Sequence, residues 1–258
     1  MSITTLRRAD LVADQAAHPP FGHRGFAPDD PPVRVGVTGT GADLLLLVWS
    51  ATELAAEIGA GTRVLGRLGV RPGMRVANTL PGALATPGAL LLGDVSEAIG
   101  ALDVPLGTAD TEAAARAAWE LVDRVRCEVL VLAPESAATF LAAATAAARP
   151  WLQGIIWLDR PGGAERPVVP EDFPGWQRTW LAVPEVASFV ASSCARGVLH
   201  ADTGVGADVA GGELVLAPRA AAAASGPYAT GIPARAVRCP CEGEGTAFEA
   251  LVGTSPIR

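Results

Sequence analysis

The chain has 258 residues, half of them hydrophobic, and a formal net charge of −7 at pH 7. All 20 of its basic residues are arginine, so chemistry that requires a lysine amine is excluded. The acidic balance and the dispersed arginines also argue against a nucleic-acid partner, which needs clustered positive charge.

Membrane insertion and secretion are not expected either. No apolar run reaches the roughly 18 residues of a spanning helix, and residues 1–15 lack the apolar core of a signal peptide. We therefore expect a cytoplasmic protein with no membrane partner. Four cysteines in such a chain do not indicate a disulfide framework, and Cys127, inside an apolar run, is expected to be a small buried side chain.

The first part of the chain predicts alternating strands and helices. Residues 1–32 are rich in Pro, Asp and Ala and predict a helix followed by an irregular loop. Apolar residues that recur every three or four positions then predict a helix over 51–69. The other elements expected up to residue 107 are strands at 33–39 and 44–50, a turn and strand within 70–81, and a helix feeding a short strand within 82–107.

The middle of the chain continues the alternation. A helix over 108–126 opens with Thr and Asp residues that can cap its N-terminus. It is followed by an expected strand at 127–134, a helix at 135–150 and a strand at 154–159. This βαβαβ order predicts an α/β fold with a mostly parallel sheet flanked by helices on both faces.

The texture of the sequence changes after Asp159. Residues 160–180 are rich in Pro, Gly and Trp and predict a long surface loop at a domain border. From about residue 185, short β-like segments separated by glycines predict a small β-rich subdomain. The expected organisation is therefore 1–32 (helix and irregular loop), 33–184 (α/β domain) and 185–258 (β-rich, zinc-binding subdomain).

The order of these signals resembles a known family. The Gly/Thr loop GVTGTGAD at 36–43, GVRPGMRVAN, DRVRCEVLVLAPESAATFLAA, GGELVLAPRAAAAASGPYATG and a late CPC together resemble the phenylacetate–CoA ligase family of adenylate-forming enzymes. The resemblance covers roughly residues 20–250. It implies a large N-terminal domain, a mobile C-terminal lid, and activation of an aryl acid with ATP before transfer to coenzyme A.

The matching positions imply that the nucleotide machinery is altered. The family's phosphate loop resembles Val37–Asp43, but its Lys and Pro are missing and Asp43 places a carboxylate where triphosphate would lie. Glu185 matches a magnesium-binding Glu, with Leu181 in place of an aromatic residue. The Tyr-Arg-Thr-Gly-Asp motif resembles 228–232, where Ile232 replaces the Asp that holds the ribose hydroxyls.

These differences predict the loss of adenylation. The lid and its lysine are also expected to be absent, and this chemistry depends on positioned charges. We therefore interpret residues 36–43 as a degenerate phosphate loop.

A second group of residues predicts a metal site. Some family members hold zinc with a Cys six residues before a His and with a late Cys-x-Cys, and CARGVLH and CPC match that layout. Three thiolates and one imidazole would close a tetrahedral shell around a structural zinc ion. The alternative is that these are ordinary residues in β turns. The predicted ligands are Cys194, His200, Cys239 and Cys241.

Three functions remain open at this stage. The first is a repurposed, ATP-independent enzyme, for example of bacterial natural-product biosynthesis, that binds an aromatic or acyl ligand in the family's acyl pocket. That pocket is expected to be lined by parts of 77–88, 133–137 and the stretch near Asp159. The candidate acid/base residues are His23, Asp43, Glu185 and Tyr228. Alternatively, His23 is an ordinary loop residue and Asp43 a cap.

The second function is that of a non-catalytic scaffold, in which Trp176 and Trp180 of the expected loop anchor a protein partner or a homodimer. The third is a residual ligase that uses a lid from another chain, against which Ile232 argues most strongly.

Overall fold

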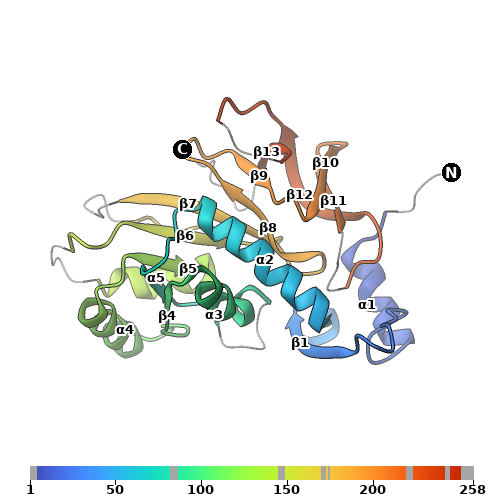
Figure 1. Cartoon of the computed structure of the whole chain (residues 1–258), viewed down its shortest axis with the longest axis horizontal. Helices are drawn as coiled ribbons and strands as arrows, with labels where there is room; N and C mark the ends of the chain where they lie inside the picture. The colour runs from blue at the N-terminus through green and yellow to red at the C-terminus, as the bar shows by residue number, and fades with distance from the viewer. Residues whose placement is uncertain are drawn as a thin grey trace.

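The structure is a computed structural model that describes residues 5–81, 87–144, 149–169, 173, 175–218, 223–241 and 245–250. Figure 1 shows a long sheet with most of its helices grouped around one end and a set of C-terminal strands at the other end. No helix within these ranges is long and apolar enough to cross a membrane.

An eleven-stranded sheet joins the described strands in the order β10-β11-β12-β13-β9-β8-β7-β6-β5-β3-β4. Its N-terminal half in sequence, at the end of this order, is parallel, because β7, β6, β5, β3 and β4 all run in one direction. These strands span Arg75–Asn78 (β3), Leu102–Pro105 (β4), Val129–Leu132 (β5), Gly154–Asp159 (β6) and Trp176–Val183 (β7).

Helices cover both faces of the parallel half, as the alternation predicted. In β5, Val129 and Val131 pack into the core under α2 and α3, whereas Leu130 and Leu132 pack into the core under α4 and α5. This period of two is the pattern of a strand buried on both faces. The helices span Ala51–Arg67 (α2), Pro87–Ile99 (α3), Glu112–Val125 (α4) and Pro134–Ala142 (α5).

Local capping explains where two of these helices begin. The Ser50 hydroxyl accepts the N–H of Glu53 while the Glu53 carboxylate accepts the N–H of Ser50, so a capping box opens α2. Thr111 caps α4 through the N–H of Ala114. Cys127, just after α4, is buried, and this burial raises the pKa of its thiol to about 11.

The second half of the sheet is antiparallel, so the prediction of a mostly parallel sheet holds only as far as β7. β7 and β8 pair directly across residues 184–185, which makes the sheet continuous at the expected domain border. The strands here span Ala187–Ser193 (β8), Leu199–Ala201 (β9), Val205–Ala210 (β10), Glu213–Pro218 (β11), Tyr228–Ala236 (β12) and Ala247–Ala250 (β13).

The expected surface loop at 160–180 is wrong over its last residues, which form the start of β7. Trp180 is fully buried, stacks on Phe189 with a centroid distance of 4.6 Å, and donates its indole N–H to the carbonyl of Ser188. Trp176 packs against the backbone of Gly154 in β6, where an added Cβ would lie only 2.4 Å from the ring. These tryptophans belong to the sheet and its core. A loop was predicted because a Trp-rich strand next to Pro and Gly has the composition of a loop.

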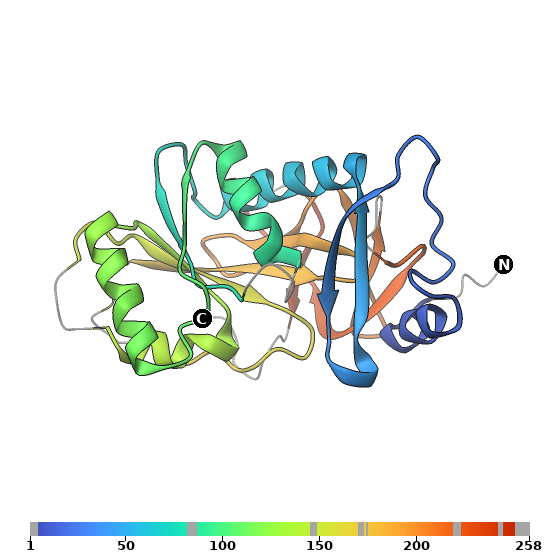
Figure 2. The ribbon, with the colours of Figure 1, turned by 90° about the horizontal axis from the view of Figure 1, so that it is seen from below.

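A separate hairpin and an N-terminal helix complete the fold. The hairpin pairs β1 (Pro32–Thr38) with β2 (Leu45–Ser50) through a short 3-10 turn at Gly41–Asp43. Figure 2 shows the hairpin beside the first helix, α1 (Arg8–Ala17), and the C-terminal strands. Two hydrogen bonds between the Gln15 amide and the backbone of Leu46 tie α1 to β2.

Candidate functional site

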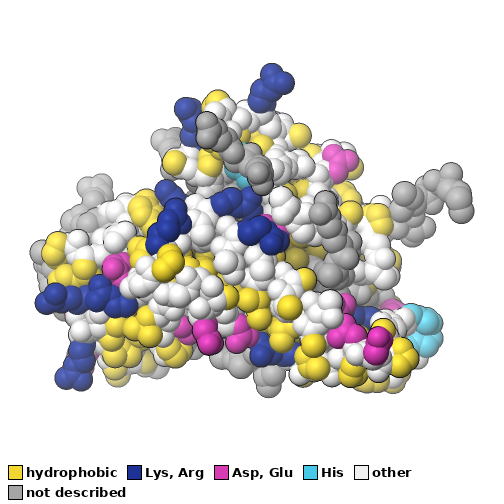
Figure 3. Space-filling view, viewed as in Figure 1, with side chains coloured by type: hydrophobic (Ala, Val, Ile, Leu, Met, Phe, Trp, Pro, Cys, Tyr) yellow, Lys and Arg dark blue, Asp and Glu magenta, His cyan; other side chains and the backbone are white. Residues whose placement is uncertain are grey.

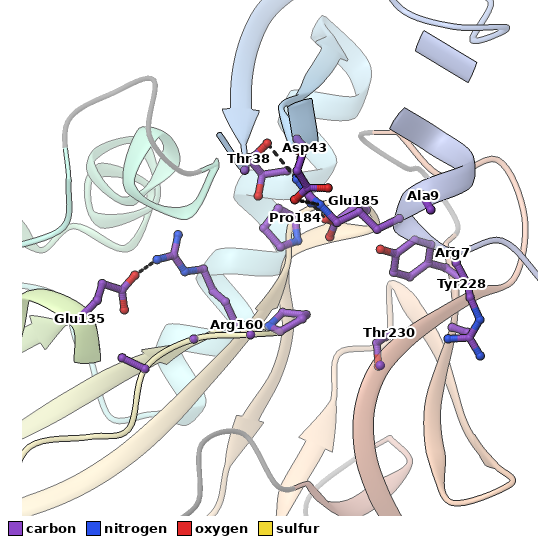
Figure 4. A pocket seen from close by; sticks show the side chains of 18 residues that line it. Arg7, Ala9, Thr38, Asp43, Glu135, Arg160, Pro184, Glu185, Tyr228 and Thr230 are labelled. Atoms are coloured by element: carbon purple, nitrogen blue, oxygen red, sulfur yellow. Dashed lines mark hydrogen bonds and ion pairs between the residues drawn. The ribbon is translucent and has the colours of Figure 1, made fainter. Parts of the chain in front are cut away.

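A cavity in the described part of the chain has a volume of about 850 Å³. It lies between the start of α1, the hairpin turn, the loop after β6, the β7–β8 turn and the start of β12 (Figure 4). Asp43, Glu185 and Tyr228 all line it, so three of the four predicted acid/base residues lie together. The other charged residues that line it are Arg7, Arg8, Glu135 and Arg160.

The guanidinium of Arg8 occupies the Gly/Thr loop. Its Nε donates to the Asp43 carboxylate at 2.8 Å, and its Nη2 donates to the carbonyl oxygens of Thr38 at 3.0 Å and Asp43 at 2.6 Å. Its Nη1 pairs with the carboxylate of Glu185. One cation therefore binds both ends of the loop and the carboxylate opposite it.

The loop itself is shaped for a cation. The N–H groups of Asp43 and Leu44 donate to the carbonyls of Thr40 and Gly41 within the turn, so these two donors are already used. Gly39 has a φ of +78°, and a Cβ there would lie 2.2 Å from both Arg8 Nη2 and the Asp43 carbonyl oxygen. A loop that cradles phosphate presents N–H groups to it. This one presents oxygen acceptors, the opposite polarity.

Glu185 is a buried carboxylate whose main partner is Arg8. Its side chain is 4 % exposed, and burial raises its pKa although the pairing with Arg8 opposes that shift. Its Oε2 atom has no hydrogen-bond partner among the described residues. The group therefore has a free acceptor and a proton affinity above that of an ordinary Glu.

Tyr228 lies beside this pair. Burial raises the pKa of its phenol, and the negative charge of Glu185 raises it further, so the hydroxyl stays neutral at physiological pH. The backbone around it is held by residue 6, because the N–H of Leu6 donates to the carbonyl of Pro227 and the N–H of Ala229 donates to that of Leu6. Figure 4 shows the phenol and Glu185 on the same wall.

The segment after Tyr228 differs from the prediction at Ile232. Ile232 is 3 % exposed and packs in the core among residues of β11 and β8, so it does not line the cavity. The physical reason is a bulge: β11 residues 213 and 215 pair with β12 residues 233 and 229, and Gly231 has a φ of +74°. The irregularity turns residue 232 inward.

The polar groups of the bulge, on the wall of the cavity, are hydrogen-bonded within the protein. The Gly231 N–H donates to Glu213 at 2.6 Å, and Glu213 is held by both terminal nitrogens of Arg7 at 3.0–3.1 Å. The Thr230 hydroxyl donates to the carbonyl of Leu214. This wall therefore has its own internal partners at the position where the family resemblance implied ribose contacts.

The opposite wall contains a second ion pair. Arg160, the first residue after β6, pairs with Glu135 at the start of α5, and burial lowers the pKa of the Arg160 guanidinium. Residues 161–164 also line this wall, as does Glu135 of the expected 133–137 segment. Asp159 points elsewhere and pairs with Arg166. Of the expected 77–88 segment, residues 82–86 lie outside the described residues, and residues 77–81 do not line the cavity.

His23 does not lie in this cavity. Its imidazole Nδ1 lies 2.5 Å from the Asp14 carboxylate, and it lines a separate cavity of about 320 Å³ beside α1. The grouping expected at the site therefore excludes His23, which belongs to the loop after α1.

The predicted metal ligands lie together at the other end of the sheet. The four ligand atoms of Cys194, His200, Cys239 and Cys241 all lie within 4.8 Å of one another. The separations are 3.8 Å for Cys194–Cys239 Sγ, 3.0 Å for Cys239–Cys241 Sγ and 3.1 Å for Cys241 Sγ to His200 Nε2. With Zn–S bonds of about 2.3 Å, a tetrahedral shell places two sulfurs about 3.8 Å apart. The cluster is therefore able to hold a metal ion of this size.

Sequence reasoning missed three residues of the large cavity: Arg8, Glu135 and Arg160. Arg160 and Glu135 follow the carboxyl ends of β6 and β5, which is where ligands of parallel sheets bind, and that rule could have found them. Arg8 offered no local signal, because its partners are 30 to 177 residues away.

No protein-family model and no curated sequence matches this chain. Solved structures with the same fold do exist. An open conformation of 2-hydroxyisobutyryl-CoA ligase in complex with 2-HIB-AMP and CoA has a TM-score of 0.77 and 17 % identity, covering 97 % of this chain and 63 % of that one. The N-terminal domain of FACL13 from Mycobacterium tuberculosis has a TM-score of 0.62 and 14 % identity, covering 93 % and 65 %.

A third such structure is O-succinylbenzoate coenzyme A synthetase (MenE) from Bacillus subtilis in complex with AMP. It has a TM-score of 0.57 and 13 % identity, covering 86 % of this chain and 50 % of that one. The chain thus has the fold of adenylate-forming acyl-CoA ligases and spans less than two thirds of each of these three structures. Identities this low establish the fold alone.

Proposed function

We propose that this chain is a ligase-like protein that does not adenylate, and that it binds a small aromatic or acyl ligand in the 850 Å³ cavity, without ATP. The observation that carries the proposal is the Arg8 guanidinium held by the loop at 36–43, where the resemblance would place a triphosphate. Displacing it would leave Glu185 and Asp43 facing the nucleotide's negative charge.

The charge balance of the cavity supports the same conclusion. Its charged lining residues are three arginines (7, 8 and 160) and three acids (43, 135 and 185), which sum to zero. Binding of triphosphate depends on an excess of positive charge or on a metal that supplies it. A neutral, mixed lining suits an acyl or aryl ligand of low net charge.

The polar groups available to such a ligand are few and close together. Tyr228 offers a neutral hydroxyl, and Glu185 on the same wall has an Oε2 atom that is buried, has no partner among the described residues, and reaches a ligand only after a small side-chain movement. A carboxyl and a phenol can exchange a proton with a bound ligand when they lie within hydrogen-bond reach of it. We therefore assign proton transfer to Glu185 and Tyr228, with Arg8 fixing the position and charge of Glu185.

Thermal denaturation of the full chain with separate ligands tests the proposal, because a ligand that binds only the folded protein raises its melting temperature. Aryl and acyl carboxylic acids and their esters are expected to stabilise the protein. ATP with Mg²⁺ and AMP are expected not to. Carboxylate-dependent exchange of pyrophosphate into ATP is the matching activity assay, and no exchange is expected.

Stabilisation by ATP with Mg²⁺, or measurable pyrophosphate exchange, would restore the ligase function and overturn the proposal. Stabilisation by none of the ligands would also overturn it, in favour of a scaffold. The two tryptophans no longer support a scaffold, because Trp180 is fully buried and Trp176 packs on β6.

We also propose that Cys194, His200, Cys239 and Cys241 hold a structural zinc ion. Four protein ligands fill a tetrahedral shell and leave no position for a substrate. The ion would tie the β8–β9 turn to the segment after β12. Metal analysis of the purified chain is expected to give zinc, and Cys239→Ser is expected to lose one equivalent; an unchanged metal content in that variant would contradict the assignment.

A further inference from the structure

A second cluster of metal-ligating side chains lies at the end of α1 and on the loop after it, outside both sites described above. Two of the chain's three histidines converge there on one carboxylate: the Nδ1 atoms of His18 and His23 lie 3.1 Å and 2.5 Å from the same oxygen of Asp14. The centroids of the two imidazole rings are only 3.7 Å apart. Figure 3 shows histidine side chains gathered on the surface beside α1.

The backbone conformation at the end of α1 and in the loop after it brings these three residues together. Asp14 and His18 are four residues apart along the chain, which places them on one side of the helix end. The Gly22 N–H then donates to the carbonyl of His18, and the His23 N–H donates to the second Asp14 oxygen at 2.8 Å. The loop thus folds His23 back onto the helix.

Gly22 is required for this return. Its φ is +70°, and a Cβ at this position would lie 2.1 Å from Asp14 Oδ2. A side chain here would push the loop off the carboxylate. The helix that supplies Asp14 is itself fixed, because Leu11 is buried in the core and Gln15 is bonded to Leu46. The cluster therefore has a defined geometry although its histidines are exposed.

We propose that Asp14, His18 and His23 bind a divalent transition-metal ion of the zinc class through one carboxylate oxygen and two Nδ1 atoms. All three ligand atoms lie within 4.8 Å of one another. Bonds of about 2.0–2.2 Å from zinc to nitrogen and oxygen place tetrahedral ligands about 3.4 Å apart. The His18 distance nearly meets this value, and a small rotation of His23, whose side chain is 73 % exposed, brings it there.

This site differs in kind from the Cys/His cluster. It has three protein ligands instead of four, and an ion held by three ligands keeps a position open for water or another molecule. His23 also lines the 320 Å³ cavity, whose other walls include Leu6, Leu11, Phe21 and Arg24. Asp14 lines the same cavity, so the proposed site borders a space large enough for a small ligand with a nitrogen or oxygen donor.

Zinc titration of the full chain tests the proposal independently of the proposed function. Calorimetry is expected to show a binding event separate from that of the Cys/His cluster, and nuclear magnetic resonance is expected to show both imidazoles shifting with it. Asp14→Asn, His18→Gln and His23→Gln should each weaken this event by at least about tenfold, since even loss of an outer partner costs a metal site about 10–100-fold.

Matched variants make the result decisive. Asp29→Asn removes one charge from an exposed residue of the same loop region and is expected to leave the event unchanged. Cys239→Ser is expected to remove the other zinc and to keep this one, with its sensitivity to His23→Gln. If wild type and the three ligand variants give the same isotherm, the proposal fails and the cluster is a hydrogen-bonded loop anchor.

Discussion

The Gly/Thr loop at 36–43 and the Cys/His cluster differ in what their polar atoms bind. In the loop, two carbonyl oxygens and a carboxylate enclose a guanidinium of the same chain. In the cluster, three sulfurs and an imidazole nitrogen lie within 4.8 Å of one another, close enough to share a metal ion. Both were recognised from sequence patterns. Only the second has the donor atoms that its pattern implies, because a pattern of residue types does not fix the direction in which backbone groups point.

The largest effect is expected at the Cys/His cluster. Removing the proposed zinc with a strong chelator should destabilise the protein by about 4 kcal/mol, the contribution of a ligand present at a thousand times its dissociation constant. Thermal denaturation with and without chelator measures it, and Cys127 provides the control, because Cys127→Ala leaves the cluster intact. If the chelator does not change the melting temperature of wild type, the cluster holds no stabilising metal, and the proposed difference between the loop and the cluster is wrong.

The next largest effect is expected at Glu57, a buried carboxylate that can be compared with Glu185 because no ion pair with an arginine is found for it among the described residues. Glu57 in α2 is fully buried, accepts the N–H of Ser188, and burial raises its pKa to about 7. Its folded pKa exceeds the unfolded one, so its contribution to stability is present below about pH 4.5 and is lost as the pH rises to about 7. At 1.36 kcal/mol per pKa unit, the free energy of unfolding of Glu57→Gln relative to wild type should be about 3 kcal/mol higher above pH 7 than below pH 4.5.

Urea unfolding of Glu57→Gln at a series of pH values measures this gain. The stability difference from wild type should grow between about pH 4.5 and 7 and then level off. Glu97→Gln, which changes an exposed carboxylate on α3, is expected to show no such dependence. A difference that stays constant with pH would mean that the pKa of Glu57 is the same in the folded and the unfolded protein.

Removal of the Arg8 side chain is expected to have a smaller effect, of about 2 kcal/mol. Truncating one partner of a buried ion pair leaves the other uncompensated, at a cost of about 3–5 kcal/mol. Here the cost is reduced because the raised pKa of Glu185 lets it take up a proton. Arg8→Ala should therefore lose less stability at pH 5 than at pH 8 in urea unfolding.

The neighbouring arginine is the control for this change. Arg7 is 60 % exposed and pairs with Glu213 at the surface, so Arg7→Ala should cost no more than about 1 kcal/mol with little dependence on pH. Equal effects of the two substitutions would show that the cation in the loop is replaceable. The comparison between loop and cluster would then rest on the cluster alone.

The parts of the fold that local pattern determines were predictable. The alternation of β5 between two cores and the Thr111 cap follow from neighbouring residues. β7 was missed because Trp176 and Trp180 stand next to Pro and Gly, and their burial depends on partners in β6 and β8.

The candidate site divides in the same way. Asp43, Glu185 and Tyr228 were placed together through the family resemblance, and the structure brings them together. Ile232 was aligned with the family's ribose-binding Asp, but a bulge between β11 and β12 turns it into the core. Arg8 was missed since an ion pair between distant parts of the chain has no local signature.

The smallest predicted effect separates backbone strain from the contact with Arg8. Gly39 and Gly41 both have positive φ values, +78° and +56°, so alanine at either position costs of the order of 1 kcal/mol through strain alone. At Gly41 no atom lies within 4 Å of an added Cβ, whereas at Gly39 the Cβ would collide with Asp43 and the Arg8 guanidinium. Gly39→Ala should therefore cost about 1 kcal/mol more than Gly41→Ala in urea unfolding, the scale of a disturbed ion pair. That difference should vanish in an Arg8→Ala background if the guanidinium causes it and persist if the Asp43 carbonyl does, and only the first outcome makes the cation part of the loop's structure.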